Sequence, residues 1–389
     1  LARERLVPGE RQALEATLRT LVANPGALGG YQRQDGVALT EKGAPHLPSP
    51  NPEMQGSAVR YLIVTNEALA PEFERLAEHR TAQGLPALVV TREWIASNFR
   101  QGADFPETLR MFLQRAYAMW GVEYLLLGGD TDILPPRYVR SSFYPFGGHT
   151  DIPTDIYFAG LDGNWNADGD AWYAEPYVSD SNRGDDADLA PDLAVGRAPV
   201  STAAEVVDFV DKVITYETTT PDSPWTNRFL FAAEVLFPHP YVPGGPITLD
   251  GALYAANLIE DIIVPCTDME YLRMYEVDIN HERDLPLTKA ALIDTLNTGH
   301  YGHFNQFGHG HFFNMSVGDA QFTVLDADAL TNAPHYFMLF AVNCASGAYD
   351  VSCLMERFVK NPQGGSIISV GAAREAFPSN SYGYQETFY

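Results

Sequence analysis

Cysteine is scarce in this sequence, which has only Cys266, Cys344 and Cys353 among its 389 residues. These thiols are too few for a disulfide framework, and because their number is odd at least one is free or pairs outside the chain. The fold must therefore be held by a hydrophobic core rather than by cross-links. A thiol that stays free is also a candidate nucleophile.

Basic charge is scarce as well, since 25 Lys and Arg residues stand against 50 Asp and Glu residues, giving a formal net charge of −25. This charge argues against nucleic acid or anionic membrane as a main partner, because both would repel the chain. It suits solubility, cation binding and the attraction of basic peptides. No apolar run approaches the roughly 20 residues that a membrane-spanning helix requires.

The ends of the sequence point to a processed chain. It begins with LARERLVPGE and has no initiator methionine, so we expect a trimmed or fragmentary product with any signal peptide already removed. Residues 1–57 combine helical spacing of leucines with a proline-rich linker. A pro-segment, the tail of an upstream domain and a packed N-terminal extension all stay open. The sequence stops at GYQETFY, and we expect a C-terminal part of the domain to be missing.

Hydrophobic residues make up 46% of the sequence, enough for about two to three core-forming units. Short apolar runs alternate with amphipathic helical stretches, a pattern typical of α/β folds with a parallel sheet covered on both faces. The chain divides into residues 58–224 and 225–389, as two adjoining α/β units or one sheet built in two halves. The predicted strands are 61–65, 86–91, 124–129, 228–234, 269–276, 301–309, 335–344 and 364–373.

Twelve residues of the chain contain four of its ten histidines: His300, His303, His309 and His311. His309 and His311 lie two apart and would face the same side of a strand. With the other two they would provide three nitrogen ligands and a water for zinc. Against a metal site, the sequence has no HExxH motif and no companion cysteine pair. The alternative is one catalytic histidine among ordinary neighbours.

His309 and Cys344 each follow a predicted apolar strand, and ligands of α/β sheets gather at such strand ends. The 35 residues between them leave room for a crossover back into the same sheet. Imidazole and thiol together form a nucleophile with its base. Main-chain N–H groups near Gly310 and Cys344 would hold the oxyanion. Glu234 also follows an apolar strand, and its carboxylate would face the same rim and stabilise the imidazolium.

These features resemble the gingipain branch of the caspase–legumain–gingipain superfamily of cysteine peptidases. The resemblance covers residues 61–388 and rests on YLLLGGDTDILPPR, DLAVGRAPV, FLFAAE, FGHG and AVNCASGAYD. It implies a caspase-like parallel-sheet sandwich (α/β/α) in two adjoining subdomains. It further implies Cys344 as nucleophile, His309 as base and Glu234 as the residue that orients His309. Asp250 is implied to select Arg or Lys at the cleavage position, and Phe377 to form an aromatic wall.

The stretch DGNWNADGDAWYAE has the spacing of a calcium loop, with glycine at the sharp bend and a closing glutamate. The predicted ligands are Asp162, Asn164, Asn166, Asp168, Asp170 and Glu175. A solvated acidic loop without calcium is the alternative. Calcium at millimolar concentration is an extracellular condition, so the loop favours an extracellular or cell-surface protein.

The sequence as a whole predicts a cysteine endopeptidase acting on proteins or peptides through a thioester acyl-enzyme, with cleavage after basic residues. We expect structural Ca²⁺, no organic cofactor, an inhibitory pro-segment in residues 1–57 and neither nucleic-acid binding nor a membrane span. Two alternatives remain: a catalytically idle domain used for binding or surface assembly, and a metal-dependent hydrolase built on the histidine cluster. Cys266 and Cys353 are expected to be small apolar core residues.

Overall fold

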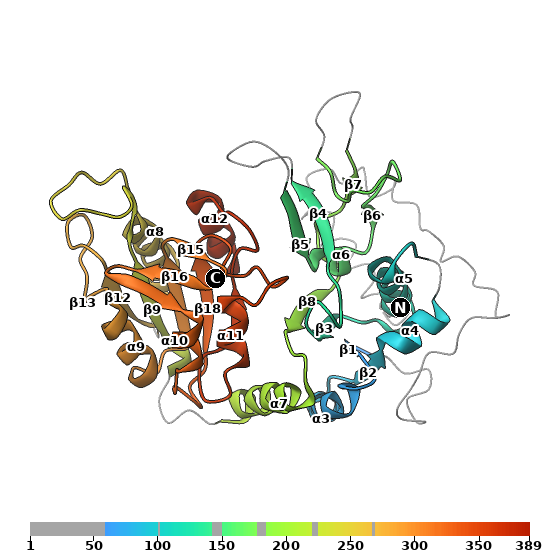
Figure 1. Ribbon diagram of the computed structural model, residues 1–389. Coiled ribbons are helices and arrows are strands. Elements are labelled where there is room, and N and C mark those ends of the chain that lie inside the picture. Colours follow the sequence, from blue (N-terminus) through green and yellow to red (C-terminus); the bar gives the residue numbers. More distant parts are fainter. Residues whose placement is uncertain (1–58, 100–101, 142–149, 177–183, 220–224, 267–268) are drawn as a thin grey trace, which may run out of the picture.

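The computed structural model describes residues 59–99, 102–141, 150–176, 184–219, 225–266 and 269–389. The helix and linker predicted within residues 1–57 lie outside the described residues. Two separate parallel sheets form the two halves of the molecule, which stand side by side in Figure 1. Of the two arrangements left open by the sequence, the structure therefore has two adjoining α/β units.

The first half is built on a four-stranded sheet of order β2-β1-β3-β8, in which every pair is parallel. The strands β1, β2 and β3 are mostly apolar and buried, as expected for a sheet covered on both faces, whereas the edge strand β8 is more exposed. The strands are β1 (Tyr61–Thr65), β2 (Ala87–Thr91), β3 (Tyr124–Gly128) and β8 (Ala194–Ala198). The helices are α3 (Ala70–Ala82), α4 (Arg92–Asn98), α5 (Phe105–Trp120), α6 (Ile156–Ala159) and α7 (Ala203–Thr218).

Two small hairpins extend the first half beyond its sheet. One pairs β4 (Arg137–Ser141) with β5 (Thr150–Thr154), and the other pairs β6 (Gly163–Asn164) with β7 (Asp186–Ala187). Local capping sets the neighbouring helices. The Asp104 side chain accepts the N–H of Glu107 at the start of α5, and Gly121 ends that helix with φ of +73°.

The second half carries a six-stranded parallel sheet of order β13-β12-β9-β14-β18-β19. The strands are β9 (Arg228–Ala233), β12 (Glu270–Tyr275), β13 (Leu285–Pro286), β14 (His303–Phe307), β18 (Phe337–Val342) and β19 (Ser366–Val370). The helices are α8 (Gly251–Leu258), α9 (Lys289–Thr298), α10 (Val324–Asp328), α11 (Leu354–Lys360) and α12 (Pro378–Phe388), with one-turn segments Trp225–Asn227 and Ile259–Ile263. Short strands add β10 (Val235–Phe237), β11 (Leu249–Asp250), β15 (Gly310–His311), β16 (Asn314–Val317) and β17 (Ala320–Thr323).

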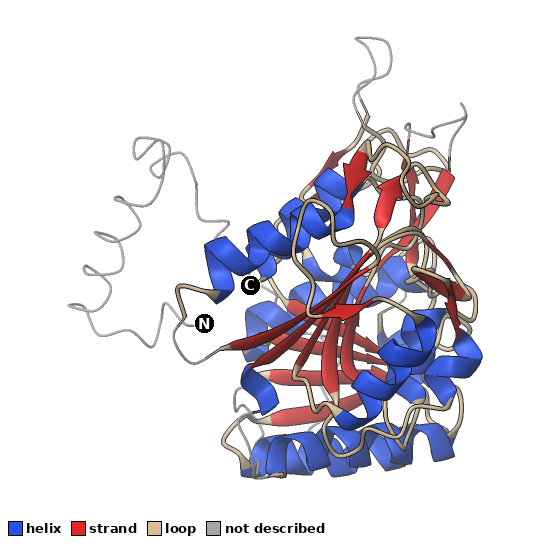
Figure 2. Ribbon diagram, turned by 90° about the vertical axis from the view of Figure 1, so that its left-hand side faces the viewer, coloured by secondary structure: helices blue, strands red, loops and turns tan. Residues whose placement is uncertain are grey.

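Side-chain alternation along β9 shows that both faces of this sheet are buried. Leu230 and Ala232 pack in a core with residues of α9 and α11, whereas Phe229 and Phe231 pack in a second core with residues of α8. Helices accordingly lie on both sides of the fanned strands in Figure 2. The predicted α/β/α sandwich is confirmed. No helix in the described ranges is both long and apolar enough to cross a membrane.

Helix α7 joins the two halves. Its capping box, formed by Thr202 and Glu205, starts the helix, and its buried Lys212 reaches into the second half. The Lys212 Nζ donates to the carbonyl oxygens of Val359 and Gly364 at 2.8 Å, of Phe358 at 3.2 Å and of Ser366 at 3.3 Å. One ammonium group thus links α7 to the end of α11 and the start of β19.

Candidate active site

The two strands predicted to carry the site are neighbours in the second sheet. Phe307, the last residue of β14, stands opposite Val342, the last residue of β18, in a parallel register. His309 and Cys344 each follow two residues later, so both leave the same edge of the sheet. The expectation that these segments adjoin is confirmed by the strand pairing.

Gly310 marks how closely the two loops approach. A methyl group at this position would lie 2.7 Å from Cγ of Asn343 and 2.9 Å from the carbonyl oxygen of Cys344. Any side chain at position 310 would therefore push the histidine loop away from the cysteine loop. The sequence predicts a main-chain N–H near Gly310 for the oxyanion, and the structure adds a packing reason for glycine at this position.

The imidazole of His309 is held by β10 and the loop that follows it. Its Nε2 lies 2.8 Å from the carbonyl oxygen of Leu236, which can only accept a hydrogen bond, so we assign the proton to Nε2. Nδ1 is then the basic nitrogen. The ring packs against His239 with ring centroids 4.2 Å apart, and Phe237 lies edge-on at 5.7 Å. Sequence reasoning missed His239, which lies in an irregular loop without a motif.

Cys344 is partly exposed, as a nucleophile must be. Its Sγ lies 3.4 Å from the N–H nitrogen of Ala376 and 3.6 Å from the carbonyl oxygen of the same residue. The main-chain N–H of Cys344 donates to no acceptor within the described ranges, which leaves it available to an oxyanion. Of the other thiols, Cys353 is buried as expected, but Cys266 is exposed and the prediction that it fills a core is wrong.

Glu234 is buried directly after β9, with 2% of its surface exposed. Its carboxylate accepts the main-chain N–H of His309 at 3.2 Å, the N–H of Gly318 at 2.9 Å and the hydroxyl of Ser316. These hydrogen bonds hold the main chain of the histidine loop rather than the imidazole ring. Glu234 was predicted to orient His309, and its hydrogen bonds lie on the main-chain segment that carries the ring.

A buried polar network underlies both loops. The Gln306 amide donates to the carbonyl oxygen of Ser316, and the Asn343 amide donates to Oε1 of Gln306 at 2.9 Å. Asn343 in turn accepts the hydroxyl of Ser346. Buried polar groups fix geometry when each has its partner. The sequence signal was present, because Gln306 is a polar residue near the end of β14 and Asn343 directly follows the apolar strand β18, but a single sequence does not pair them.

The two residues predicted to bind substrate flank this network differently. Asp250 is only 7% exposed; one carboxylate oxygen accepts the N–H of Ala252 at the start of α8, and Oδ2 is buried without a hydrogen-bond partner in the described part of the chain. Burial raises the pKa of Asp250. Phe377 is 46% exposed and directly follows Ala376, whose main chain contacts Sγ of Cys344.

The clustered histidines do not converge on a metal. His300 stacks on His335, His303 stacks on Phe229, and His311 packs against Phe312, each away from His309. Burial lowers the pKa of His303 to about 4. Among the described residues, the group whose side chains could hold a metal ion is Asp168, Asp170 and Glu175.

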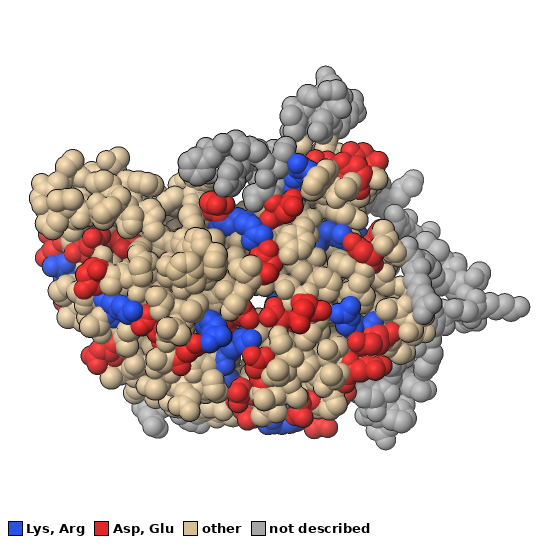
Figure 3. All heavy atoms as spheres, in the orientation of Figure 1, with Lys and Arg blue, Asp and Glu red and all other residues tan. Residues whose placement is uncertain are grey.

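Those three carboxylates belong to the predicted calcium loop and lie within 4.8 Å of one another. Oδ1 of Asn166 is buried without a hydrogen-bond partner in the described ranges, and burial followed by the charges of Asp170 and Asp168 raises the pKa of Glu175. Asn164 instead accepts the N–H of Asn166, and Asp162 faces Asp188, whose hydrogen bond raises the pKa of Asp162. Acidic side chains gather over β6 and β7 in Figure 3.

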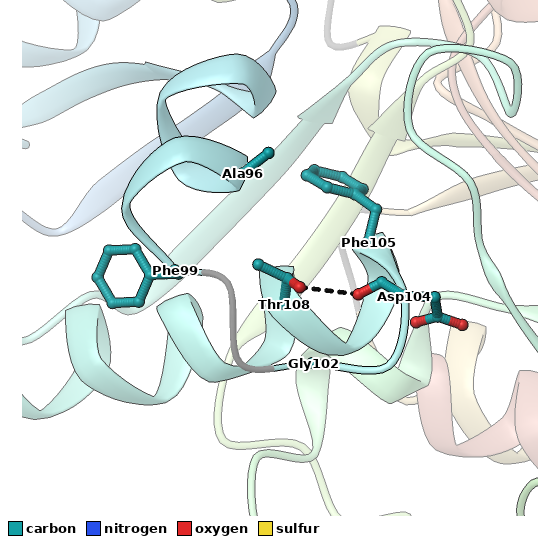
Figure 4. Close-up of a pocket in the computed structure, with 6 residues that line it drawn as sticks. All are labelled: Ala96, Phe99, Gly102, Asp104, Phe105 and Thr108. Atoms are coloured by element: carbon teal, nitrogen blue, oxygen red, sulfur yellow. Dashed lines mark hydrogen bonds between the residues drawn. The ribbon is translucent and has the colours of Figure 1, made fainter.

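A separate cavity of about 390 Å³ lies in the first half, between α4 and the start of α5. Figure 4 shows Phe99 and Phe105 on its wall, with Thr108 Oγ1 donating to the carbonyl oxygen of Asp104 at 2.8 Å. Its lining residues all belong to the first half, so it is distinct from the rim that carries His309 and Cys344.

A histidine and a partly exposed cysteine on adjoining strand ends of an α/β sandwich define a domain of the cysteine-peptidase class. The chain belongs to peptidase family C25, whose family model matches residues 55–389. Lys-gingipain from Porphyromonas gingivalis is 22% identical over 262 residues, a match that covers 67% of this chain but only 12% of that protein.

Solved structures agree on the fold. The Arg-specific cysteine proteinase gingipain R superposes with a TM-score of 0.59 at 19% identity, over 85% of this chain and 66% of that one. A structure described as a protease has a TM-score of 0.60 at 17% identity, over 83% of this chain and 61% of that one. At these identities the likeness establishes the caspase-like fold of gingipains, and the predicted resemblance to a gingipain-type cysteine peptidase is confirmed at family level.

Proposed function

We propose that the protein is a cysteine endopeptidase in which Cys344 is the nucleophile and His309 the general base and acid. The observation that carries this proposal is the adjoining exit of the two residues from β14 and β18. Nδ1 of His309 takes the proton of the Cys344 thiol, and the thiolate attacks the carbonyl carbon of the scissile bond. The N–H groups of Cys344 and Gly310 supply hydrogen bonds to the oxyanion.

Collapse of this tetrahedral adduct breaks the C–N bond, and the imidazolium gives its proton to the leaving amine. A thioester between Cys344 and the substrate acyl group remains. His309 then takes a proton from water, the resulting hydroxide attacks the thioester, and the thiol recovers its proton as the acid product leaves. Glu234 supports these steps through the main chain of His309, since its carboxylate holds that segment in place.

Labelling with a peptidyl acyloxymethyl ketone, followed by mass spectrometry of the adduct, tests the proposal. The expected result is a single adduct on Cys344 that His309→Ala reduces at least 100-fold, the range for loss of a general base. Cys266→Ala is the matched control, because Cys266 is also an accessible thiol but lies outside the site. Equal labelling of Cys344 and Cys266, with no peptide cleavage, would support the idle binding module instead.

We further propose cleavage after basic residues, with Asp250 binding the substrate cation. The support is a buried carboxylate oxygen that has no hydrogen-bond partner among the described residues, on the strand that pairs with β10. Probes that differ only in Arg, Lys or Asp at the cleavage position measure this preference. Asp250→Asn keeps an oxygen for the Ala252 N–H, and is expected to reduce the reaction of the Arg and Lys probes while leaving the fold intact.

Calcium binding is proposed for the acidic loop, with Asp168, Asp170 and Glu175 as carboxylate ligands and the Asn166 oxygen as a neutral one. A bound cation would cancel the repulsion among these carboxylates and staple the loop. Chelation should lower the melting temperature, and readdition of Ca²⁺ should restore it. The same chelation in Asp168→Asn should have a smaller effect, and equal shifts in both proteins would contradict this ligand set.

The remaining proposals concern the whole protein. A complex between the pro- and mature domains of a Porphyromonas gingivalis gingipain has a TM-score of 0.59 with this chain, which supports an inhibitory role for residues 1–57. Added in trans, that segment should slow probe labelling of a protein from which it has been removed. Membership of the family and a calcium loop favour an extracellular or cell-surface location, testable by fractionating cells that express the full protein.

A further inference from the structure

The loop that carries the proposed nucleophile adopts an unusual main-chain conformation. Ala345, the residue after Cys344, has φ of +53°, a region that residues other than glycine seldom occupy. Such a conformation persists only where the surroundings impose it, and it concentrates at functional sites. Two hydrogen bonds restrain it: Ala345 N–H donates to the carbonyl oxygen of Arg374 at 2.9 Å, and Gly347 N–H donates to that of Ala372 at 3.0 Å.

The side chain of Arg374 returns to the other end of the same loop. Its Nη1 and Nη2 donate to the two carboxylate oxygens of Asp350 at 2.9 and 2.7 Å. The two side chains are only 24% and 12% exposed. Burial alone would raise the pKa of Asp350, but the hydrogen bonds and charge of Arg374 offset this and hold that pKa below its ordinary value. A partly buried bidentate pair of this kind is rigid.

The pair is also tied to the first half of the molecule. Nε of Arg374 donates to the carbonyl oxygen of Asp151 in β5 at 3.0 Å, and the Tyr138 hydroxyl in β4 donates to Asp350 at 3.4 Å. Beside them, the guanidinium of Arg197 in β8 lies 5.2 Å from the ring of Tyr349. The first half therefore contacts Tyr349 and Asp350 of the cysteine loop and the side chain of Arg374, although it contributes neither His309 nor Cys344.

We propose that Arg374 is a positioning residue for Cys344. Its carbonyl oxygen holds the start of the loop, its guanidinium holds the end through Asp350, and its Nε anchors both to the β4–β5 hairpin. Arg374 thereby fixes the thiol and the adjacent main-chain N–H relative to His309 without touching substrate. This proposal rests on the proposed peptidase function and adds to it a dependence of the second half on the first.

The test compares Arg374→Met with Arg357→Met in the full chain. Arg357 makes the same kind of bidentate pair with Asp328, between α11 and α10 and away from the cysteine loop. With an arginine-based acyloxymethyl ketone, Arg374→Met is expected to lower the maximal inactivation rate about 10- to 100-fold, with the probe concentration for half-maximal rate changed less than about threefold. Arg374→Lys, which keeps the charge but loses the fork, should recover part of the rate.

Two outcomes would overturn the proposal. One is a rate loss in Arg374→Met no greater than in Arg357→Met, once both are corrected for the fraction folded. The other is a change confined to the half-maximal probe concentration, which would make Arg374 part of the substrate-binding surface. Asp350→Asn is a second variant that weakens the same pair without shortening a side chain, and it should show the same rate loss in milder form.

A readout independent of catalysis separates this proposal from the proposed function. Deuterium exchange of the peptide containing residues 344–350 should become faster in Arg374→Met and stay unchanged in Arg357→Met. The carbonyl oxygen that accepts the Ala345 N–H remains in Arg374→Met, but the guanidinium that anchors its segment to Asp350 and Asp151 is lost. If the wild-type chain shows this protection but no labelling at Cys344, the peptidase proposal fails and the restraint of the loop stands. If exchange is unaltered in both variants, the positioning role fails whatever the activity.

Discussion

Replacing Lys212 by methionine should weaken the contact between the two halves of the molecule and lower the free energy of unfolding. The ammonium donates to four carbonyl oxygens of the second half. Those of Phe358 and Val359 lie in the last turn of α11, where carbonyls have no partner within the helix. Lys212 therefore acts as a helix cap supplied by another subdomain, and its charge also suits the negative end of the helix dipole.

The size of the effect follows from these acceptors. Each buried carbonyl that loses its donor costs about 1–3 kcal/mol. Ser366 and Gly364 lie where β19 begins and lose a shared donor. Methionine fills a similar volume, so we expect the free energy of unfolding to fall by about 3–5 kcal/mol in total, as for the loss of one partner from a buried charged group. For a chain of 389 residues that is a fall in melting temperature of roughly 4–6 °C.

Thermal and urea unfolding at pH 6 measure this change. Burial lowers the pKa of Lys212 to about 7, with the charge of Asp208 opposing this fall, so at pH 6 the ammonium form predominates. Lys289→Met is the control, since Lys289 forms a more exposed pair with Asp326 inside the second half and should cost less than about 1 kcal/mol. Equal losses in the two variants, or one sharp transition in Lys212→Met at the wild-type midpoint, would refute the reasoning.

Three further outcomes are expected. Gly310→Ala should slow labelling of Cys344 at least 10-fold, because its methyl group would clash with the Cys344 loop. The control Gly383→Ala lies in α12 with open space around it and should be neutral or stabilise the protein by up to about 1 kcal/mol. Comparable labelling in both variants would argue against close packing of the loops. Asp350 and Asp104 have pKa values below their ordinary range because Arg374 and Arg137 offset the effect of burial, so the stability they contribute is complete above about pH 4 and is lost as pH falls through the lower pKa values of the folded protein. The urea midpoint should therefore drop on acidification to pH 3, and less steeply in Asp350→Asn than in the wild type. Parallel pH profiles of the two proteins would exclude a contribution from Asp350. Iodoacetamide at pH 8 should modify Cys266 and Cys344 but spare Cys353, since burial raises the pKa of Cys353 to about 12. Early modification of Cys353 in the native protein would contradict its burial.

Much of the fold could be predicted because its signals are local. The strand predicted at 61–65 is β1 without any shift, and the strand predicted at 86–91 is β2 with one residue fewer. Gly84, which has a φ of +86°, follows the end of α3 at Ala82. Apolar runs, helical spacing and glycine each act over a few residues, so a single sequence reveals them. Short antiparallel pieces such as β15–β17 were missed, since only their pairing defines them.

The candidate site was predictable in its reacting groups and not in their supports. His309 and Cys344 stand out because each follows an apolar strand and the order of strands makes them adjacent. Arg374 lies three residues before Phe377 in the sequence, but nothing in that stretch shows what it binds. Its partners Asp350 and Asp151 lie 24 and 223 residues away, and no local pattern encodes contacts at such separations. The sequence predicted the correct edge of the sheet for Glu234. Its hydrogen bonds from the main-chain N–H groups of the histidine loop depend on how that loop folds, which the sequence did not show.

The β4–β5 hairpin offers a second point of vulnerability in the proposed peptidase, in the first half of the molecule and separate from His309 and Cys344. The imidazole and the thiol are held in place by different parts of the chain. The histidine segment is hydrogen-bonded within the six-stranded unit, whereas the cysteine segment depends on the hydrogen bond from Arg374 to Asp151 across the subdomain boundary. An antibody or small molecule that bound at this boundary and broke the contact would displace the thiol without competing with a peptide substrate. Inhibition of that kind would be insensitive to substrate concentration, which sets it apart from any blocker of the cleavage position.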